Sequence, residues 1–229
     1  MPFRNRIEAG KKLAQALSAY KGQPCAVLAL PRGGVPVAAE IAGALGAPLD
    51  LILVRKVGVP SQPELAMGAV VDGADPIIVR NDDIIQLAGI SAAEFDAVCA
   101  SELEEIERRR GLYLGKRPRA EIAGRIAIVV DDGIATGATT RAALRATRMR
   151  KPQKLVLAVP VGPTQTVEEL KGEADEIVCL ESYESFGAIG FFYHDFRQIS
   201  DKEVIDTLAR FSTVPDGGPG QESGPRVPV

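Results

Sequence analysis

The chain contains few of the residues from which metal centres, disulfide frameworks and histidine-dependent catalysts are built. Its 229 residues include one histidine, three cysteines and no tryptophan. Cys25, Cys99 and Cys179 are odd in number and far apart, so they provide neither a disulfide framework nor a zinc-binding spacing. A reducing compartment is therefore expected. The single His194 has no Ser or Cys nucleophile motif beside it, and we interpret it as a structural or surface residue.

Long apolar segments and a strong charge imbalance are also missing. No stretch approaches the ~20 apolar residues that a membrane helix needs, and the residues after Met1 do not resemble a signal peptide. The net charge of −3, from 27 Lys+Arg and 30 Asp+Glu, disfavours a protein that mainly coats nucleic acid. With 46% hydrophobic residues, the composition indicates a globular protein with a sizeable core. We expect a cytoplasmic protein that binds no membrane.

Apolar segments typical of buried strands alternate with amphipathic segments typical of helices. The strands are expected at residues 25–30, 49–54, 126–131, 154–160 and 176–180. The helices are expected at residues 4–20, 35–45, 138–149 and 164–171. This alternation predicts an α/β fold with an open, mostly parallel sheet flanked by helices. The core of that fold should span about 1–55 and 121–181.

Residues 56–120 interrupt the alternation. The Gly- and Pro-rich residues 56–75 predict a mobile loop with one short strand at 66–71, and another strand is expected at 76–80. Residues 91–112 predict a long helix that begins with a capping box. Together with 182–200, this region is interpreted as a small hood, so that 1–211 form one domain. Residues 212–229, with four Gly and four Pro among 18, predict a disordered tail or linker.

The strongest functional signal lies where the strand at 126–130 ends. Asp131 and Asp132 follow this strand, at the edge of an open α/β sheet where ligands bind. Gly133 and Gly137 then allow the backbone to approach a ligand closely, and the helix beginning near Ala138 presents unpaired amides. Three side chains add hydroxyl donors: Thr136, Thr139 and Thr140. The loop is therefore predicted to bind a terminal phosphate.

Two common phosphate-binding motifs are absent from this junction. No lysine completes a Gly-x4-Gly-Lys-Ser/Thr pattern, and there is no Gly-x-Gly-x-x-Gly, which excludes a nucleoside-triphosphate loop and a dinucleotide fingerprint. Carboxylates repel phosphate, so Asp131 and Asp132 must bind another part of the ligand. A vicinal diol, which donates two hydrogen bonds to carboxylate oxygens, fits. The ligand is thus predicted to be a phosphorylated ribose.

The 11 residues Val129–Thr139 resemble the signature of type I phosphoribosyltransferases, which bind phosphoribosyl pyrophosphate (PRPP). The resemblance implies that Asp131 and Asp132 hold the ribose 2- and 3-hydroxyls. It implies that the 5-phosphate is bound by Ala135, Thr136, Gly137, Ala138, Thr139 and Thr140. It also implies a homodimer. The alternative interpretation is that the acids merely cap a helix and that the Gly-Thr residues form a turn.

A second loop, Pro31-Arg32-Gly33-Gly34, follows the first buried strand and resembles the diphosphate loop of the same family, in which a cis peptide is common. Gly33 and Gly34 expose amides, and Arg32 supplies a guanidinium fork for phosphate oxygens. Arg55 and Lys56, at the end of the next strand, are expected to add positive charge. A strand-ending turn with surface charges is the alternative.

Two further elements are interpreted through the same resemblance. Residues 56–68 resemble, in place and composition, the family's mobile loop, which closes over the active site. The acceptor base of the family stacks on an aromatic residue after the last core strand, and Phe186 is the candidate here. A core aromatic is the alternative for Phe186. The later Phe191, Phe192 and Tyr193 are expected to pack.

The resemblance implies an enzyme, a glycosyltransferase that displaces diphosphate from ribose C1 with a nitrogen heterocycle. Asp131 and Asp132 would favour the positive charge of an oxocarbenium-like ring, and Arg32 would neutralise the leaving group. Mg²⁺ is expected to bridge the diphosphate and the hydroxyls, with no protein ligands except through the two aspartates. The sequence leaves the acceptor open among purines, pyrimidines and other rings.

Two alternatives remain at this level. A non-catalytic PRPP sensor would use the same pocket for regulation, and the basic residues within 108–110 and 116–119 would then contact nucleic acid. However, Arg108 and Arg109 have acidic partners at helical spacing, so nucleic acid is not the expected ligand. A sugar-phosphate hydrolase would leave Arg32-Gly33-Gly34 unexplained.

Overall fold

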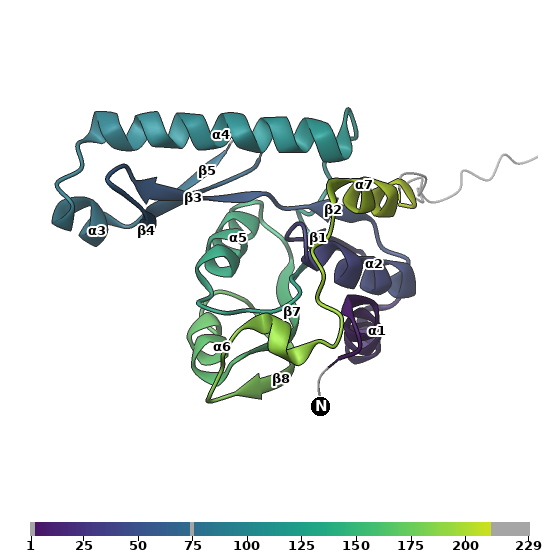
Figure 1. The fold of residues 1–229 in the computed structure, drawn as a ribbon. Helices are drawn as coiled ribbons and strands as arrows, with labels where there is room; N and C mark the ends of the chain where they lie inside the picture. Colours follow the sequence, from purple (N-terminus) through teal and green to yellow (C-terminus); the bar gives the residue numbers. More distant parts are fainter. Residues whose placement is uncertain (1–2, 74–75, 212–229) are drawn as a thin grey trace, which may run out of the picture.

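The computed structural model describes residues 3–73 and 76–211. Its central sheet has five parallel strands in the order β2-β1-β6-β7-β8 (Figure 1). The strands are β1 (Cys25–Ala29), β2 (Leu49–Leu51), β6 (Ile126–Val130), β7 (Lys154–Pro163) and β8 (Glu176–Tyr183). The predicted α/β fold with an open parallel sheet is confirmed. Strand β2 is shorter than expected, because the chain leaves the sheet after Leu51.

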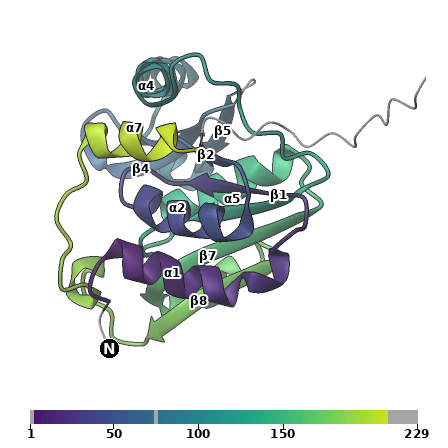
Figure 2. The same cartoon turned by 90° about the vertical axis from the view of Figure 1, so that its right-hand side faces the viewer.

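Helices cover both faces of this sheet, which explains why its central strands are apolar throughout. One face carries α1 (Arg6–Ala16) and α2 (Gly34–Leu45), and the other carries α5 (Ala138–Met149) and α6 (Thr164–Leu170), as Figures 1 and 2 show. Successive residues of a strand point to opposite faces. Accordingly, Val27 packs in the cluster that contains α1 and α2, whereas Leu28 packs in the cluster that contains α5.

The hood consists of a second sheet under a long helix. Strands β3 (Val54–Val59), β4 (Gln62–Val71) and β5 (Ile77–Arg80) form an antiparallel sheet in that order. Helices α3 (Asp82–Leu87) and α4 (Ala92–Leu114) follow, and α4 runs along this sheet (Figure 1). The capping box of Ser91 and Glu94 begins α4 as predicted. The prediction of a loop over 56–68 is wrong, because these residues belong to a β-hairpin.

The glycine and proline residues of the hairpin occupy positions that a strand tolerates. Strand β4 pairs with β5 only from Gly68 onward, and Pro63 lies before this point. The N–H that Pro63 lacks therefore removes no hydrogen bond to β5. Gly58 lies at an irregularity in the β3–β4 register, where a Cβ would overlap the carbonyl oxygen of Pro63. The buried Val57 and Met67 pack in the same cluster as α4 residues, which stabilises the hairpin.

A buried ion cluster joins the hood to the core. Asp72, at the end of β4, accepts a hydrogen bond from the Leu53 backbone at 2.9 Å through Oδ1. Its Oδ2 accepts from Arg110 of α4 at 3.0 Å and also from Arg119. Burial of a charge costs stability unless the charge is paired, and here every member of the cluster has a partner.

The last elements include one helix that the sequence analysis missed. Short helices η1 (Ser18–Tyr20) and η2 (Ile189–Phe192) precede α7 (Asp201–Ala209), which lies between α2 and α4 in Figure 2. Within residues 3–73 and 76–211, no helix is long and apolar enough to span a membrane. The tail predicted at 212–229 lies outside the described residues.

Candidate active site

The two signature loops leave neighbouring strands at the same edge of the sheet. Strands β1 and β6 are paired in parallel up to Ala29 and Val130. The Leu30 amide then donates to the Val130 carbonyl at 2.9 Å, which holds the chains together as both loops begin. Residues 31–34 and 131–137 therefore lie side by side, as the sequence predicted.

Close packing between the loops explains their glycines. A Cβ on Gly33 would overlap the carboxylate of Asp132, and one on Gly34 would lie 2.7 Å from the carbonyl oxygen of Val130. The peptide bond between Pro31 and Arg32 is cis, in agreement with the resemblance to a diphosphate loop. The two loops thus form one continuous surface.

The predicted phosphate loop wraps around the start of α5. Gly137 caps this helix with a φ of 74°, a conformation that glycine adopts readily. Thr136, Ala138 and Thr139 are exposed at the loop surface, next to the first amides of α5. Thr140 differs from the prediction, since it is only 3% exposed.

The two aspartates have different surroundings. Asp131 is half-buried and lines a cavity of about 70 Å³ together with Thr139 and Arg55. Asp132 is 8% exposed, and its Oδ2 accepts a hydrogen bond from Arg6 Nε at 2.7 Å. Burial, followed by the charge of Asp132, raises the pKa of Asp131 well above its usual range. Only Asp131 of the pair lines the cavity.

A sequence model of the phosphoribosyl transferase domain matches residues 4–197. This chain belongs to the phosphoribosyltransferase family. A Mycobacterium tuberculosis H37Rv protein named "Putative phosphoribosyl transferase Rv0571c" is 49% identical over 208 residues, which cover 91% of this chain and 46% of that protein. Its counterpart in strain CDC 1551, named "Putative phosphoribosyl transferase MT0597", matches equally. The chain spans about half the length of the curated relatives it matches.

A solved structure shares this fold. The crystal structure of TT1426 from Thermus thermophilus is 39% identical to this chain and superposes with a TM-score of 0.80. The match covers 93% of this chain and 100% of the TT1426 chain. This match confirms the fold, including the small antiparallel sheet beside the central one.

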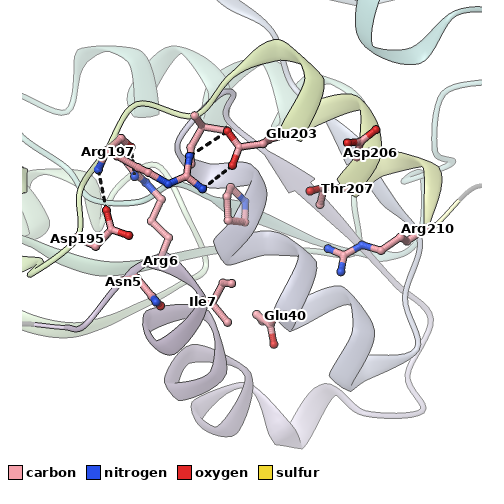
Figure 3. A pocket seen from close by; sticks show the side chains of 12 residues that line it. Asn5, Arg6, Ile7, Glu40, Asp195, Arg197, Glu203, Asp206, Thr207 and Arg210 are labelled. Atoms are coloured by element: carbon pink, nitrogen blue, oxygen red, sulfur yellow. Dashed lines mark hydrogen bonds and ion pairs between the residues drawn. The ribbon is translucent and has the colours of Figure 1, made fainter.

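Arg6 contacts the acidic pair, and the sequence analysis missed it. Besides holding Asp132, its guanidinium lies over the Phe196 ring at 3.9 Å and donates to the Arg197 carbonyl at 2.9 Å. Arg6 and Arg197 also line a surface cleft of about 410 Å³ between α1, α2 and α7 (Figure 3). Nothing in the pattern of the first helix distinguishes Arg6 from a surface charge, because its partners lie more than 120 residues away.

The backbone of Asp132 is held as well. Its carbonyl oxygen accepts a hydrogen bond from the Tyr193 hydroxyl at 2.7 Å. Burial, and then the charge of Asp132, raises the pKa of Tyr193, so this phenol stays a donor. Tyr193 therefore packs, as expected, and it also positions the acidic pair.

Arg32 of the predicted diphosphate loop contacts α7, which, like α3, was not predicted. Its guanidinium lies 3.5 Å from Asp201 of α7, and Asp201 also accepts from the Tyr113 hydroxyl of α4 at 2.6 Å. Burial and the hydrogen bond to Asp201 raise the pKa of Tyr113 to about 12. Arg32 is thus oriented by residues from both α7 and the hood.

The other two predicted cations line different cavities. Arg55 borders the small cavity with Asp131 and donates to Glu102 of α4 at 2.6 Å. Lys56 pairs with Glu64 across the hairpin at 3.1 Å. It lines a larger cavity of about 580 Å³, which also includes Thr136 and Thr139. Thr139 borders both cavities and so connects the two groups.

The aromatic residues at and after the end of β8 form a stack. Phe186 and Tyr183 each lie 4.8 Å from Phe192, ring centre to ring centre, so Phe186 has at least one face covered. Phe191 was expected to pack, and this is wrong: it is 76% exposed. Ile189 fills the space where a Gly133 side chain would lie, which places this segment against the start of the phosphate loop.

The basic residues near the end of α4 point mostly to acids and carbonyls of the protein itself. Arg108 and Arg109 both bind Glu105, and Arg110 and Arg119 bind Asp72. Arg117 donates to backbone carbonyls that include Leu49 at 2.7 Å. The cluster that a nucleic-acid sensor would need is therefore largely neutralised.

Proposed function

We propose that this chain is an enzyme that transfers the 5-phosphoribosyl group of PRPP to a nitrogen heterocycle and releases diphosphate. The observation that carries the proposal is the contact between the two signature loops, which packs Gly33 against Asp132 while Asp131 lines the adjoining cavity. A ligand bound across this junction would meet helix amides, a carboxylate and arginines in the order in which PRPP presents its groups.

The proposed roles follow from the surroundings of each residue. The amides of Ala135–Thr139 and the hydroxyls of Thr136 and Thr139 would bind the 5-phosphate, and Asp131 would accept hydrogen bonds from the ribose hydroxyls. Asp132, held by Arg6, would keep one carboxylate oxygen for the ligand. The diphosphate would be bound by Arg32, the amide of Gly33, Arg55 and Lys56. The prediction that Gly34 also exposes its amide is wrong, because this N–H donates to the Leu30 carbonyl at 3.0 Å.

The acids present suit a magnesium ion that arrives with the substrate. Among the described residues, no group of three or more His, Cys, Asp or Glu side chains could hold a metal. Mg²⁺ commonly binds through one or two carboxylates together with substrate phosphates and water, which the setting of Asp131 allows. When bound, the ion would neutralise charge on the diphosphate.

The protein's own groups would favour the reaction in two ways. Asp131 lies where positive charge would develop on the ribose ring, and the arginines lie where negative charge would grow on the leaving group. Arg55 and Arg109 of the hood line the cavity beside Asp131, and the hood would there exclude water, which competes with the acceptor. From the family resemblance we also propose a homodimer and an acceptor site near Phe186.

The test is to incubate the protein with PRPP, Mg²⁺ and a panel of purines, pyrimidines and other heterocycles, and to measure diphosphate. Release that depends on one base supports the transferase, whereas tight PRPP binding without turnover indicates a sensor. The Asp131→Asn variant should bind PRPP about 10–100-fold more weakly by calorimetry. The exposed Asp96→Asn variant serves as the control. Unchanged affinity in Asp131→Asn would contradict the proposed site.

A further inference from the structure

Three consecutive arginines of α4 have three different settings. Arg108 has a side chain 63% exposed and pairs with Glu105 on the surface. Arg110 points inward to the buried Asp72. Arg109 lies between them, 36% exposed, and lines the small cavity that also contains Asp131 and Arg55. The hood thus adds a positive charge to the site.

Arg55 and Arg109 are each fixed by one nitrogen only. Arg55 donates through Nε to Glu102 at 2.6 Å, and Arg109 donates through Nε to Glu105 at 2.7 Å. Among residues 3–73 and 76–211, neither guanidinium makes another hydrogen bond or ion pair. Each therefore keeps both terminal nitrogens, which form the fork that binds phosphate oxygens in pairs.

The spacing along α4 explains how one helix supplies these contacts. Glu102, Ile106 and Arg109 follow each other at intervals of four and three residues, so they lie on one stripe of the helix. Ile106 and Arg109 both line the cavity, and the partner of Glu102, Arg55, lines it too. Pro31, the first residue of the diphosphate loop, completes this wall.

We propose that Arg109 binds the diphosphate of PRPP together with Arg55, and that Glu102 and Glu105 are positioning residues for this pair. The inference rests on the proposed function and adds a substrate-binding residue from the hood. The cavity lies between Pro31 and Asp131, hence between the proposed diphosphate and ribose sites. The fully ionised diphosphate is the most highly charged part of PRPP. Its charge would attract the free terminal nitrogens of Arg55 and Arg109.

The experiment compares Arg109→Gln with Arg108→Gln, which removes the neighbouring charge that shares Glu105. Calorimetry with Mg²⁺ would measure three ligands: PRPP, diphosphate and ribose 5-phosphate. For Arg109→Gln we expect about 10–100-fold weaker binding of PRPP and of diphosphate, the range typical of a lost charge-assisted bond. Ribose 5-phosphate lacks the diphosphate and should bind unchanged. Arg55→Gln should show the same pattern.

The outcomes separate this inference from the proposed function. If the unmodified protein binds neither PRPP nor ribose 5-phosphate, the proposed function fails. If it binds both and Arg109→Gln matches Arg108→Gln for diphosphate, the function stands and the role of Arg109 is rejected. Equal loss of ribose 5-phosphate and diphosphate affinity in Arg109→Gln would also reject it, because the change would then act on the site as a whole.

Discussion

The hood helix α4 contributes arginines to two charged regions that are built differently. In the Asp72 cluster, the side chain of Asp72 is 2% exposed and both of its oxygens accept hydrogen bonds, two of which come from arginines. In the small cavity, Arg55 and Arg109 are about one-third exposed and use one nitrogen each. The first region has no capacity left for a ligand, whereas the second keeps donors free.

This difference indicates how structural and ligand-binding charges can be told apart in one protein. A buried charge stabilises the fold only when its partners satisfy it, so the Asp72 cluster should respond strongly to the loss of one member. A half-exposed charge is screened by water and contributes little to stability. Its loss should change ligand binding instead. The following predictions test that separation.

The largest effect on stability is expected for Asp72→Asn. The change leaves the guanidiniums of Arg110 and Arg119 without their shared carboxylate beneath the hood, at a cost of about 3–5 kcal/mol in the free energy of unfolding. Urea unfolding followed by circular dichroism measures this, with Asp96→Asn as the exposed control. If Asp72→Asn lowered the free energy of unfolding no more than the control does, the Asp72 cluster would not be the stabilising region that we infer.

A smaller loss of stability is expected for Arg6→Met, because one carboxylate loses its ion pair and the Arg197 carbonyl loses one donor. Asp132 would stay buried without its ion pair, which costs about 2–3 kcal/mol. PRPP affinity should fall as well, since Asp132 would no longer be held against Gly33. Parallel unfolding and calorimetric titrations would show both effects. Weaker PRPP binding at unchanged stability would mean that Arg6 acts on the ligand directly.

Asp131→Asn should change the free energy of unfolding in the opposite direction, so that the variant is more stable at neutral pH. The pKa of Asp131 is raised above its ordinary value of 3.8, so at a pH between the unfolded and folded pKa values the folded protein holds a proton that the unfolded chain has released. The carboxyl therefore costs stability as the pH rises from its unfolded pKa toward its folded pKa, and this cost persists at neutral pH. Asp131→Asn should unfold at higher urea than the unmodified protein at pH 7, and this gain should vanish below the unfolded pKa. A loss of stability at pH 7 would show that the ionised acid is structural.

The smallest effect is expected for Arg108→Gln. Its side chain is largely exposed, and Glu105 keeps its bond to Arg109. Neither the melting temperature nor PRPP affinity should change measurably. A clear decrease in either would show that the orientation of Arg109 depends on its neighbour.

The parts of the molecule that sequence predicted well are contiguous. Asp131 to Thr139 lie on one strand–loop–helix unit, so the order of residues alone indicates what they present to a ligand. The position of residues 31–34 beside this unit was predicted for a related reason, because parallel neighbouring strands bring their ends together.

The parts that were missed depend on contacts between distant segments. Arg6 meets Asp132 across 126 residues, and Asp201 reaches Arg32 from a helix that was not predicted. The β-hairpin at 54–71 is stabilised by α4, which begins only at Ala92, and the Gly and Pro residues of the hairpin resemble those of a loop. Arg109 and Arg110 are the same residue type, and the sequence does not distinguish them. They face different directions only because successive residues of α4 point to different sides of the helix.

The packing of Gly33 against Asp132 has a consequence for variation in this protein. Any side chain at position 33 would occupy the volume of the carboxylate, so Asp132 would have to leave Arg6 or the loop at 31–34 would have to withdraw. Position 33 should therefore tolerate no other amino acid. If a library randomised at this codon were selected for PRPP capture, glycine should dominate the recovered clones.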